Sequence, residues 1–308
     1  MLRVRLDRVR STGTGLLAAV LLMGTMGAAW AQTPSPQPRI TSAPNNVDYG
    51  RAVVIEGRLD DGTPGMQVQL EKSVDGGAWR SISRDVTDDE NRVRFRLDDI
   101  KRSAGFRLAY EDEATGSVQR SERERVAVKA RLRVRTTKTH VMQGRRVRVF
   151  GSLFPKVGGR RVVVAQKVAG EWKRFARARA GDGTFSVYLR PGDSGVRPLR
   201  VRFTGDDLNR RATARAAIRV YEPDLATWYG PGLYGNRTAC GQRLGYDTLG
   251  VAHRSLPCGT DVNILYNGRT ITVPVIDRGP YSSADWDLTA ETADRLGFSG
   301  KETIGTEH

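Results

Sequence analysis

The 308-residue sequence contains few of the side chains that hold metals or cofactors. It has three histidines and two cysteines, and they form no Cys/His cluster with the spacing of a zinc site. A glycine-rich phosphate-binding loop is missing, and so is the Ser-His-Asp order found in many hydrolases. We therefore expect neither a metal nor a nucleotide cofactor.

Long hydrophobic runs are missing after the first 30 residues. At the N-terminus, four arginines precede an apolar run from Leu16 to Trp30, and Ala31 completes an Ala-Trp-Ala tripeptide. This pattern is typical of a secretory signal peptide, so we expect residues 1–31 to be removed by cleavage after Ala31 and the protein to be secreted. No cysteine follows the cleavage site, which argues against a lipoprotein. An uncleaved membrane anchor is the alternative, although the run is short and contains glycine.

The only two cysteines, Cys240 and Cys258, both lie in the last quarter of the sequence. An exported protein can form a disulfide, and a bridge between these two would close a loop of about 18 residues. Such a bridge contributes on the order of 3 kcal/mol to stability if it is unstrained. Two free thiols are the alternative.

Acidic residues are scarce in one part of the chain. Residues 130–221, the basic segment, contain 23 Lys and Arg but five Asp and Glu, whereas residues 32–129 have a net charge of −1 and residues 222–308 of −4. A surface with a net charge of +18 attracts polyanions, and it does so less at high salt. A solvated arginine-rich face that reflects compositional bias is the alternative, since Arg outnumbers Lys 42 to 8.

Helical periodicity is absent from residues 32–221. Residues 32–46 form a Pro-rich linker. Short alternating runs separated by turn signals predict strands in residues 47–129, and the basic segment repeats this plan, since residues 49–59 align with 143–153 at an offset of 94. We therefore expect two immunoglobulin-like β-sandwich repeats, at 47–129 and 130–221.

Two pairs of aromatic residues support this alignment. Trp79 and Trp172 recur at an offset of 93, and Phe95 and Phe185 at an offset of 90. We interpret the two tryptophans as core or strand-edge packing residues, with sugar-stacking platforms as the alternative. His140 is isolated, and we expect it to have a packing or surface role.

Residues 222–308 have a different pattern, and we expect Pro223 to mark their boundary because proline does not continue a central strand. Asn267-Gly268 is a strong hairpin signal. A helix is expected over 289–297, with Thr289 as its N-cap and Gly297 at its end. Strands are expected at 248–252, 261–266 and 269–276. The pattern predicts a small β-barrel with short helices, whose last strand is left open because the sequence stops at His308.

A series of motifs in residues 225–305 carries a resemblance to a known family. In chain order the motifs are Thr-Trp-Tyr-Gly at 227–230, Thr-Ala-Cys-Gly at 238–241, Ala-His-Arg-Ser-Leu-Pro at 252–257, Gly-Thr at 259–260, Asn-Gly-Arg at 267–269, Asp-Arg-Gly-Pro-Tyr at 277–281 and Asp-Leu-Thr at 287–289. Together they resemble the double-psi β-barrel domain of the rare lipoprotein A (RlpA) family. The motif around Cys240 also resembles, more distantly, the barrel of expansins and barwin-like proteins.

The resemblance implies a six-stranded double-psi β-barrel with a polysaccharide groove. It also implies lytic transglycosylation of peptidoglycan glycan strands, which leaves a 1,6-anhydro product. The family's functional histidine and aspartate carry over to His253 and Asp277, and Asp287 matches a carboxylate in the groove of expansin-like barrels. Possible substrate-binding residues are Asp287, Trp228, Tyr229, Arg254, Arg278 and Tyr281.

General acid-base chemistry suggests a role for each of these charged groups. We assign to Asp277 the proton transfers, which need a carboxyl group with a raised pKa. His253 is expected to orient the substrate or share the proton, and Asp287 to stabilise positive charge at the anomeric carbon. The structural alternatives are a turn-capping role for Asp277 and a helix-anchoring role for Asp287.

Two functions remain open at this point. The first is a secreted, cell-wall-associated transglycosylase, with the basic segment binding an anionic wall polymer or a membrane surface. The second is a non-catalytic, expansin-like protein that binds or loosens polysaccharide. Nucleic acid is not an expected partner, since no nucleic-acid-binding motif is present.

Overall fold

The computed structural model describes residues 35–308, so the predicted signal peptide and most of the linker lie outside the described residues. This part of the chain is mainly β, as predicted, with a single helix. Its buried apolar side chains form three separate clusters, one each in residues 53–128, 130–220 and 226–304. None of the helices in residues 35–308 is long and apolar enough to cross a membrane.

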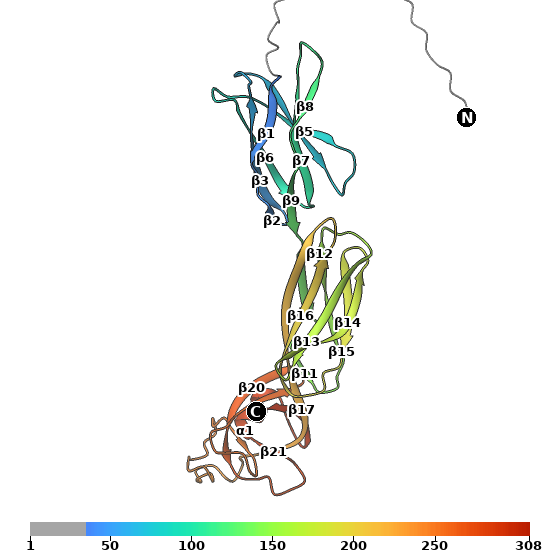
Figure 1. Cartoon of the computed structure of the whole chain (residues 1–308). Coiled ribbons are helices and arrows are strands. Elements are labelled where there is room, and N and C mark those ends of the chain that lie inside the picture. The colour runs from blue at the N-terminus through green and yellow to red at the C-terminus, as the bar shows by residue number, and fades with distance from the viewer. Residues whose placement is uncertain (1–34) are drawn as a thin grey trace, which may run out of the picture. The chain divides into compact units, whose positions relative to one another are not determined.

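The N-terminal segment, residues 36–129, contains two sheets (Figure 1). Its strands are β1 (Gln37–Ser42), β2 (Asn46–Asp48), β3 (Arg51–Asp60), β4 (Gln67–Ser73), β5 (Arg80–Val86), β6 (Arg92–Ile100), β7 (Ala104–Glu111), β8 (Val118–Arg120) and β9 (Glu124–Lys129). One sheet has the order β1-β3-β6, and the other contains β5-β4-β7-β9. Alternate residues of both sheets, such as Ile55, Leu70 and Phe106, form the core, which explains the period of two in the sequence.

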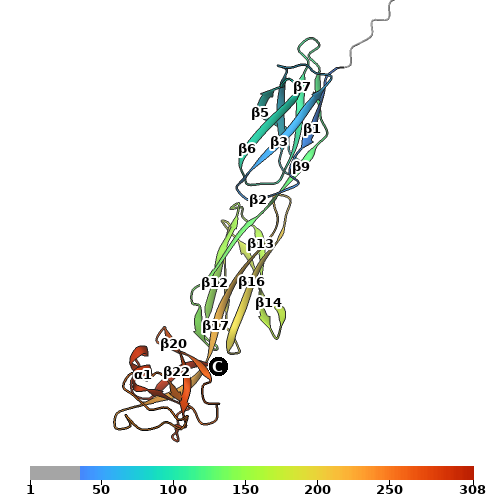
Figure 2. The same ribbon diagram turned by 90° about the vertical axis from the view of Figure 1, so that its left-hand side faces the viewer.

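The basic segment contains a second three-stranded sheet with the matching order β10-β12-β15, and a sheet that includes β14-β13-β16-β17 (Figure 2). Its strands are β10 (Arg131–Thr136), β11 (His140–Met142), β12 (Val147–Phe154), β13 (Arg160–Val168), β14 (Glu171–Ala180), β15 (Thr184–Leu189), β16 (Gly195–Gly205) and β17 (Arg210–Tyr229). In β3 and β12 a glycine is required at the same place, because a Cβ on Gly57 or Gly151 would lie 2.9 or 2.0 Å from the carbonyl oxygen of Arg39 or Arg133. Gly57 and Gly151 are 94 residues apart in the sequence, and so are Arg39 and Arg133, which is the offset at which the two segments align.

The strand registers correct one of the predicted aromatic pairs. Phe185 lies opposite Gly151, whereas Gly57 lies opposite Val93, so Phe185 takes the place of Val93 and not of Phe95. Both phenylalanines are buried on the core side. The phenylalanine of the basic segment thus occupies the neighbouring core position of its strand compared with that of the N-terminal segment. A protein core tolerates such an exchange of positions when its total side-chain volume is kept.

The two tryptophans belong to neither core cluster of their segments: Trp172 lies on β14, and Trp79 lies in the loop just before β5. Each is half-buried beneath a guanidinium group, that of Arg107 over Trp79 at 4.2 Å and that of Arg200 over Trp172 at 4.3 Å from the ring centre. His140 has the packing role expected for it, since its Nδ1 lies 2.7 Å from the hydroxyl of Tyr221.

The C-terminal domain, residues 222–308, is built on a sheet that closes into a ring. The sheet has the order β21-β18-β20-β19-β22-β17, and β21 pairs with β17 as well. The elements are β18 (Val251–Ala252), β19 (Asp261–Tyr266), β20 (Arg269–Asp277), β21 (Trp286–Thr289), α1 (Ala290–Leu296) and β22 (Glu302–Glu307). The last strand, left open by the sequence, is present as β22 and pairs with both β17 and β19.

Local signals predicted the turn and helix of this domain well. Asn267 and Gly268 both have positive φ, as the hairpin requires, and Thr289 and Gly297 cap α1 at the expected positions. Two expectations were wrong. The strand expected at 248–252 is limited to Val251–Ala252, and β17 continues through Pro223. Between residues 222 and 225, β17 pairs with β22 alone among the described strands, and a strand with one unpaired side can accommodate a proline.

Candidate functional site

A row of four residues crosses neighbouring strands of the ring. Strand pairing places Thr227 of β17 beside Asp287 of β21, Asp287 beside Ala252 of β18, and Ala252 beside Asp277 of β20. All four line a cavity of about 320 Å³. Because adjacent strands are about 4.8 Å apart, the two aspartates leave the sheet about 10 Å from each other with only a methyl group between them.

Asp277 is held at the end of β20 by the backbone around it. Its Oδ1 accepts hydrogen bonds from the N–H groups of Ala239 and Arg278, both at 2.8 Å. The bond to Arg278 is the turn-capping contact that the sequence offered as the structural alternative. The bond to Ala239 comes from a loop far away in the sequence, so the carboxylate is fixed from two sides.

The predicted disulfide between Cys240 and Cys258 is present. It follows Ala239 directly and ties the 238–241 loop to the loop after β18. The N–H of Cys240 also donates to the carbonyl of Ile276 at 3.3 Å. The bridge therefore helps to hold the N–H donor of Ala239 against Asp277.

Asp287 is half-buried and has a different environment. Burial raises the pKa of its carboxyl group above the usual range, a hydrogen bond from Thr227 opposes the rise, and the charge of Asp277 adds to it. The Thr227 hydroxyl donates to Oδ1 at 2.8 Å. Helix α1 is capped by Thr289. No hydrogen bond joins Asp287 to that helix in the part of the chain that the structure describes, so the contacts do not support the helix-anchoring alternative.

Tyr229 also lines the cavity, two residues along β17 from Thr227. Its hydroxyl is buried and has no hydrogen-bond partner among residues 35–308. Burial raises the pKa of this phenol, and the charges of Asp277 and Asp287 raise it further, so the group stays protonated and able to donate. Tyr229 is one of the expected substrate-binding residues, and its hydroxyl is an unused donor at the cavity.

His253 directly follows the end of β18, and its side chain lies on the face of the sheet that carries Trp286, opposite to the face of Asp287. Its ring packs against Trp286, a core residue, with centroids 4.4 Å apart, and does not line the cavity. Nδ1 accepts hydrogen bonds from the N–H groups of Ser255 and Leu256 at 3.2 and 3.0 Å. Burial, with the charges of His308 and Arg254, lowers the pKa of His253, which favours the neutral ring.

The backbones of His253 and Asp277 are joined, since the N–H of the former donates to the carbonyl of the latter at 3.2 Å. Their side chains share no hydrogen bond. A catalytic role for His253 stays a prediction, and its contacts fit a residue that shapes the turn after β18.

The remaining expected substrate-binding residues fall into two groups. Arg278 and Tyr281 line the cavity, and Tyr281 is 88% exposed at its rim. Arg254 donates to the carbonyls of Pro280, Ser282 and Ala284, so its guanidinium holds the loop after β20. Trp228 alternates with Thr227 and Tyr229 and does not line the cavity.

Sequence reasoning missed Thr227 and Ala252. A signal for Thr227 was present, because it alternates with Tyr229 in the same motif and must share its face. Ala252 could be found only through the register of β18 between β20 and β21, which links segments that are distant in sequence.

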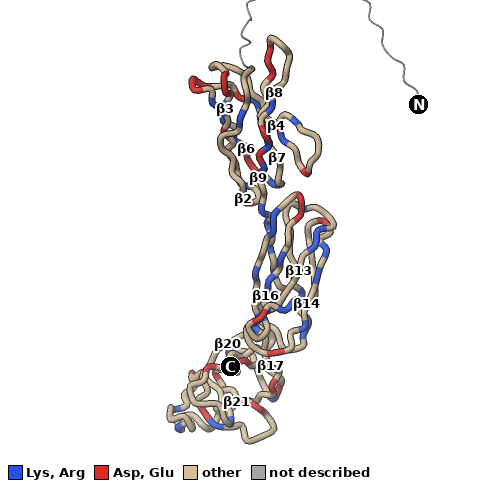
Figure 3. Tube along the Cα trace, viewed as in Figure 1, with Lys and Arg blue, Asp and Glu red and all other residues tan. Residues whose placement is uncertain are grey.

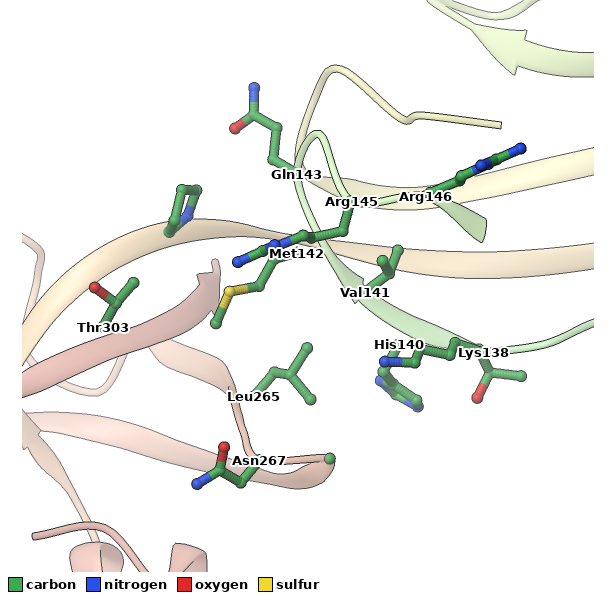
Figure 4. A pocket seen from close by; sticks show the side chains of 13 residues that line it. Lys138, His140, Val141, Met142, Gln143, Arg145, Arg146, Leu265, Asn267 and Thr303 are labelled. Atoms are coloured by element: carbon green, nitrogen blue, oxygen red, sulfur yellow. The ribbon is translucent and has the colours of Figure 1, made fainter. Parts of the chain in front are cut away.

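A larger cavity, of about 940 Å³, lies elsewhere, between β11 and the β19–β20 hairpin (Figure 4). Lys138, Arg145 and Arg146 contribute its charges, and no carboxylate lines it. It therefore lacks the acid that glycan cleavage needs. No set of three or more His, Cys, Asp or Glu side chains that could hold a metal ion is found in residues 35–308.

Comparison with known proteins points to the C-terminal domain. Residues 225–307 match the family described as lytic transglycolase. The C-terminal domain is RlpA-like. Over 88 residues it is 42% identical to a probable endolytic peptidoglycan transglycosylase RlpA of Synechocystis sp., covering 28% of this chain and 27% of that protein.

Other relatives of the RlpA-like domain carry similar names. The endolytic peptidoglycan transglycosylase RlpA of Campylobacter jejuni is 42% identical over 95 residues, covering 30% of this chain and 34% of that protein. The Neisseria meningitidis serogroup B protein of the same name is 34% identical over 137 residues, covering 42% of this chain and 56% of that protein. The chain thus spans about a quarter to a half of the length of these relatives.

One solved structure resembles a larger part of the chain. A tetra-tandem repeat from the extending region of a large adhesion protein covers 82% of this chain and 64% of its own, with a TM-score of 0.35 and 12% identity. A likeness of this size does not assign a fold.

Proposed function

We propose that the RlpA-like domain cleaves peptidoglycan glycan strands by lytic transglycosylation and leaves a 1,6-anhydro product. The observation that carries the proposal is the pair of carboxyl groups, Asp277 and Asp287, on the two sides of Ala252 in one cavity. The similarity to endolytic peptidoglycan transglycosylases supports the substrate class. In this proposal the ring is a six-stranded double-psi β-barrel.

The environments of the two carboxyl groups suggest a division of labour that differs from our first assignment. Burial favours the protonated form of Asp287, whereas Oδ1 of Asp277 accepts hydrogen bonds from two backbone N–H groups. Asp287 therefore gives its proton to the glycosidic oxygen as the bond from that oxygen to C1 of muramic acid breaks. The C6 hydroxyl oxygen then closes on C1, and its proton passes to Asp277.

Tyr229 completes the proposed site as a donor to the sugar. Its buried hydroxyl lacks a partner, and a sugar hydroxyl or ring oxygen in the cavity supplies one. Tyr281, exposed at the rim, offers a ring face on which a sugar can stack. Arg278 lies at the same cavity and suits the lactyl carboxylate of muramic acid.

The rest of the chain has a delivery role in this proposal. The protein is secreted by means of a signal peptide. Two immunoglobulin-like repeats follow this peptide and hold the catalytic domain at the cell wall. The basic segment binds an anionic wall polymer or a membrane surface through its excess of arginine.

The test is to incubate the mature chain, residues 32–308, with peptidoglycan and separately with glycan strands that lack stem peptides. Mass spectrometry before and after borohydride reduction distinguishes the products, since anhydro ends are not reduced. Non-reducible products that vanish in Asp287→Asn and Asp277→Asn support the enzyme and its site. Binding to the wall without any soluble product would contradict it and favour the expansin-like binder, for which the exposed Tyr281 is the supporting feature.

A further inference from the structure

The arginines of the two three-stranded sheets differ in how they are paired. On the outer face of β1-β3-β6, Arg39 bonds Asp60 at 3.0 Å and Arg94 bonds Glu56 at 2.8 Å. On the matching face of β10-β12-β15, Arg133, Arg135 and Arg148 are exposed, and no ion pair to any of them is present in the described residues. The arginines of the N-terminal sheet are thus neutralised by acidic residues, whereas those of the corresponding sheet in the basic segment are not.

Two substitutions between the segments explain this difference. At the offset of 94 that aligns β3 with β12, Glu56 corresponds to Phe150 and Asp60 to Phe154. The guanidinium of Arg148 lies 5.3 Å from the ring centre of Phe150, and that of Arg133 lies 5.7 Å from that of Phe154. An aromatic ring orients a guanidinium without cancelling its charge, so the N–H groups stay available to an external anion.

These arginines surround a groove of about 600 Å³. Arg179 of β14 adds a fourth positive charge at its side, and the hydroxyls of Ser152, Thr184 and Ser186 lie along its floor. None of the described residues that line the groove carries a carboxylate. Arginine forks and hydroxyl donors together match the oxygens of a phosphate group.

We propose that this arginine groove, formed by Arg133, Arg135, Arg148 and Arg179, binds a linear phosphodiester polymer. Alternate residues of a strand are about 7 Å apart, so Arg133 and Arg135 match a chain with an anion at about that interval. A polymer suits the site better than a bilayer, because the two aromatic residues that line the groove do not project from it to insert between lipids: Phe150 is half-buried beside Arg148, and Phe185 is buried in the core. This deepens the anchoring role proposed above and does not depend on the chemistry of the RlpA-like domain.

The excess charge extends to the other sheet but is arranged differently there. Lys and Arg recur along the strands of the basic segment (Figure 3). On the sheet that contains β16 and β17, the register places Arg200 beside Arg215, and neither residue lines the groove. Like charges directly opposite each other repel and destabilise a sheet. That face lacks the hydroxyl floor of the groove and serves as the internal control.

The test measures binding of a fluorescent, linear poly(glycerol phosphate) to the mature chain by anisotropy between 50 and 300 mM salt. The variant R133Q/R135Q/R148Q is compared with R174Q/R177Q/R202Q, which removes the same charge from the other sheet. We expect the groove variant to bind at least ~30-fold more weakly at low salt, with a log–log salt slope shallower by about 2, as the loss of three phosphate contacts implies. The control should lose less than about threefold.

A single substitution tests the same site without removing an arginine. Arg148 Nε donates to the hydroxyl of Ser186 at 2.7 Å, so Ser186→Asp restores the type of pairing found in the N-terminal segment. We expect it to weaken polymer binding about tenfold. Equal losses in the two triple variants, unchanged binding in Ser186→Asp, or binding to phosphatidylglycerol vesicles without binding to the polymer would each overturn the proposal. Cleavage of isolated glycan strands that carry no anionic polymer reports separately on the proposed activity, so failure of the groove and failure of the activity can be told apart.

Discussion

The cavity of the RlpA-like domain and the arginine groove place charge in opposite ways. In the cavity, two carboxyl groups are each fixed by neighbours, and burial sets the protonation of one of them. In the groove, four arginines stay exposed, and none of them forms an ion pair with an acidic residue in the described part of the chain. A reaction needs a few groups in defined protonation states, whereas binding a polymer needs many charges that need not be placed individually.

This contrast predicts different responses to single changes. One substitution in the cavity should remove activity, because no other group can take over the proton. Loss of one arginine from the groove should weaken polymer binding only slightly, and each further loss should add a similar effect. The contrast would be wrong if a single substitution in the cavity had only a small effect on activity, or if a single substitution in the groove abolished polymer binding.

The largest effect is expected for Asp287→Asn. Loss of the proton donor should reduce the rate of anhydro-product formation by roughly 10²–10⁴-fold, while binding of the chain to the wall is kept. Asp294→Asn is the matched control, since Asp294 is an exposed residue of α1 without a side-chain partner in the described contacts. A loss of similar size in the control would mean that the domain is sensitive to charge in general, as we expect only of the groove.

The double variant Cys240→Ser/Cys258→Ser should have the next largest effect. Opening a loop of 18 residues should cost about 3 kcal/mol of stability in the C-terminal domain and reduce activity, because Ala239 is no longer held against Asp277. Calorimetry and the cleavage assay measure the two effects. Polymer binding by the arginine groove should be unchanged, and its loss would show that the two regions do not fold independently.

How far the sequence predicts these regions depends on the distance over which each signal acts. Asn267-Gly268 and the caps of α1 are local, and they were placed correctly. The continuation of β17 through Pro223 was missed, because it depends on which neighbours the strand has at that point. A proline signal in the sequence cannot show that one side of the strand is unpaired.

The candidate site was found in part for the same reason. Motif resemblance identified Asp277 and Asp287, but their shared row with Ala252 depends on strand register. The sequence alignment of the two segments shows that Phe150 and Phe154 stand where the N-terminal segment has carboxylates. That this leaves arginines without an acidic partner can be seen only from the positions of the arginine side chains.

A smaller effect, on pH dependence, is expected for Thr227→Val. The donor carboxyl must be protonated, so activity is present below the pKa of Asp287 in the folded protein and is lost as pH rises through it. The hydrogen bond from Thr227 lowers that pKa. Its removal should therefore move the high-pH limb of the kcat/KM profile to higher pH. Thr272→Val, which removes a hydroxyl bonded to Asn263 in the β19–β20 hairpin, should leave the limb in place.

The smallest effect concerns a charge that is neutralised inside the N-terminal segment. Glu71 of β4 bonds Arg107 at 2.6 Å with both side chains mostly buried, whereas the matching residues of the basic segment are Ala165 and Arg200, whose Nε is buried without a partner. Glu71→Gln should cost roughly 1–3 kcal/mol in urea unfolding, because it weakens a charged hydrogen bond. Glu56→Gln, which breaks an exposed pair with Arg94, should cost less than about 1 kcal/mol. Equal costs would mean that burial does not distinguish paired from unpaired arginines in these sheets, and the contrast between neutralised and available charge would lose its physical basis.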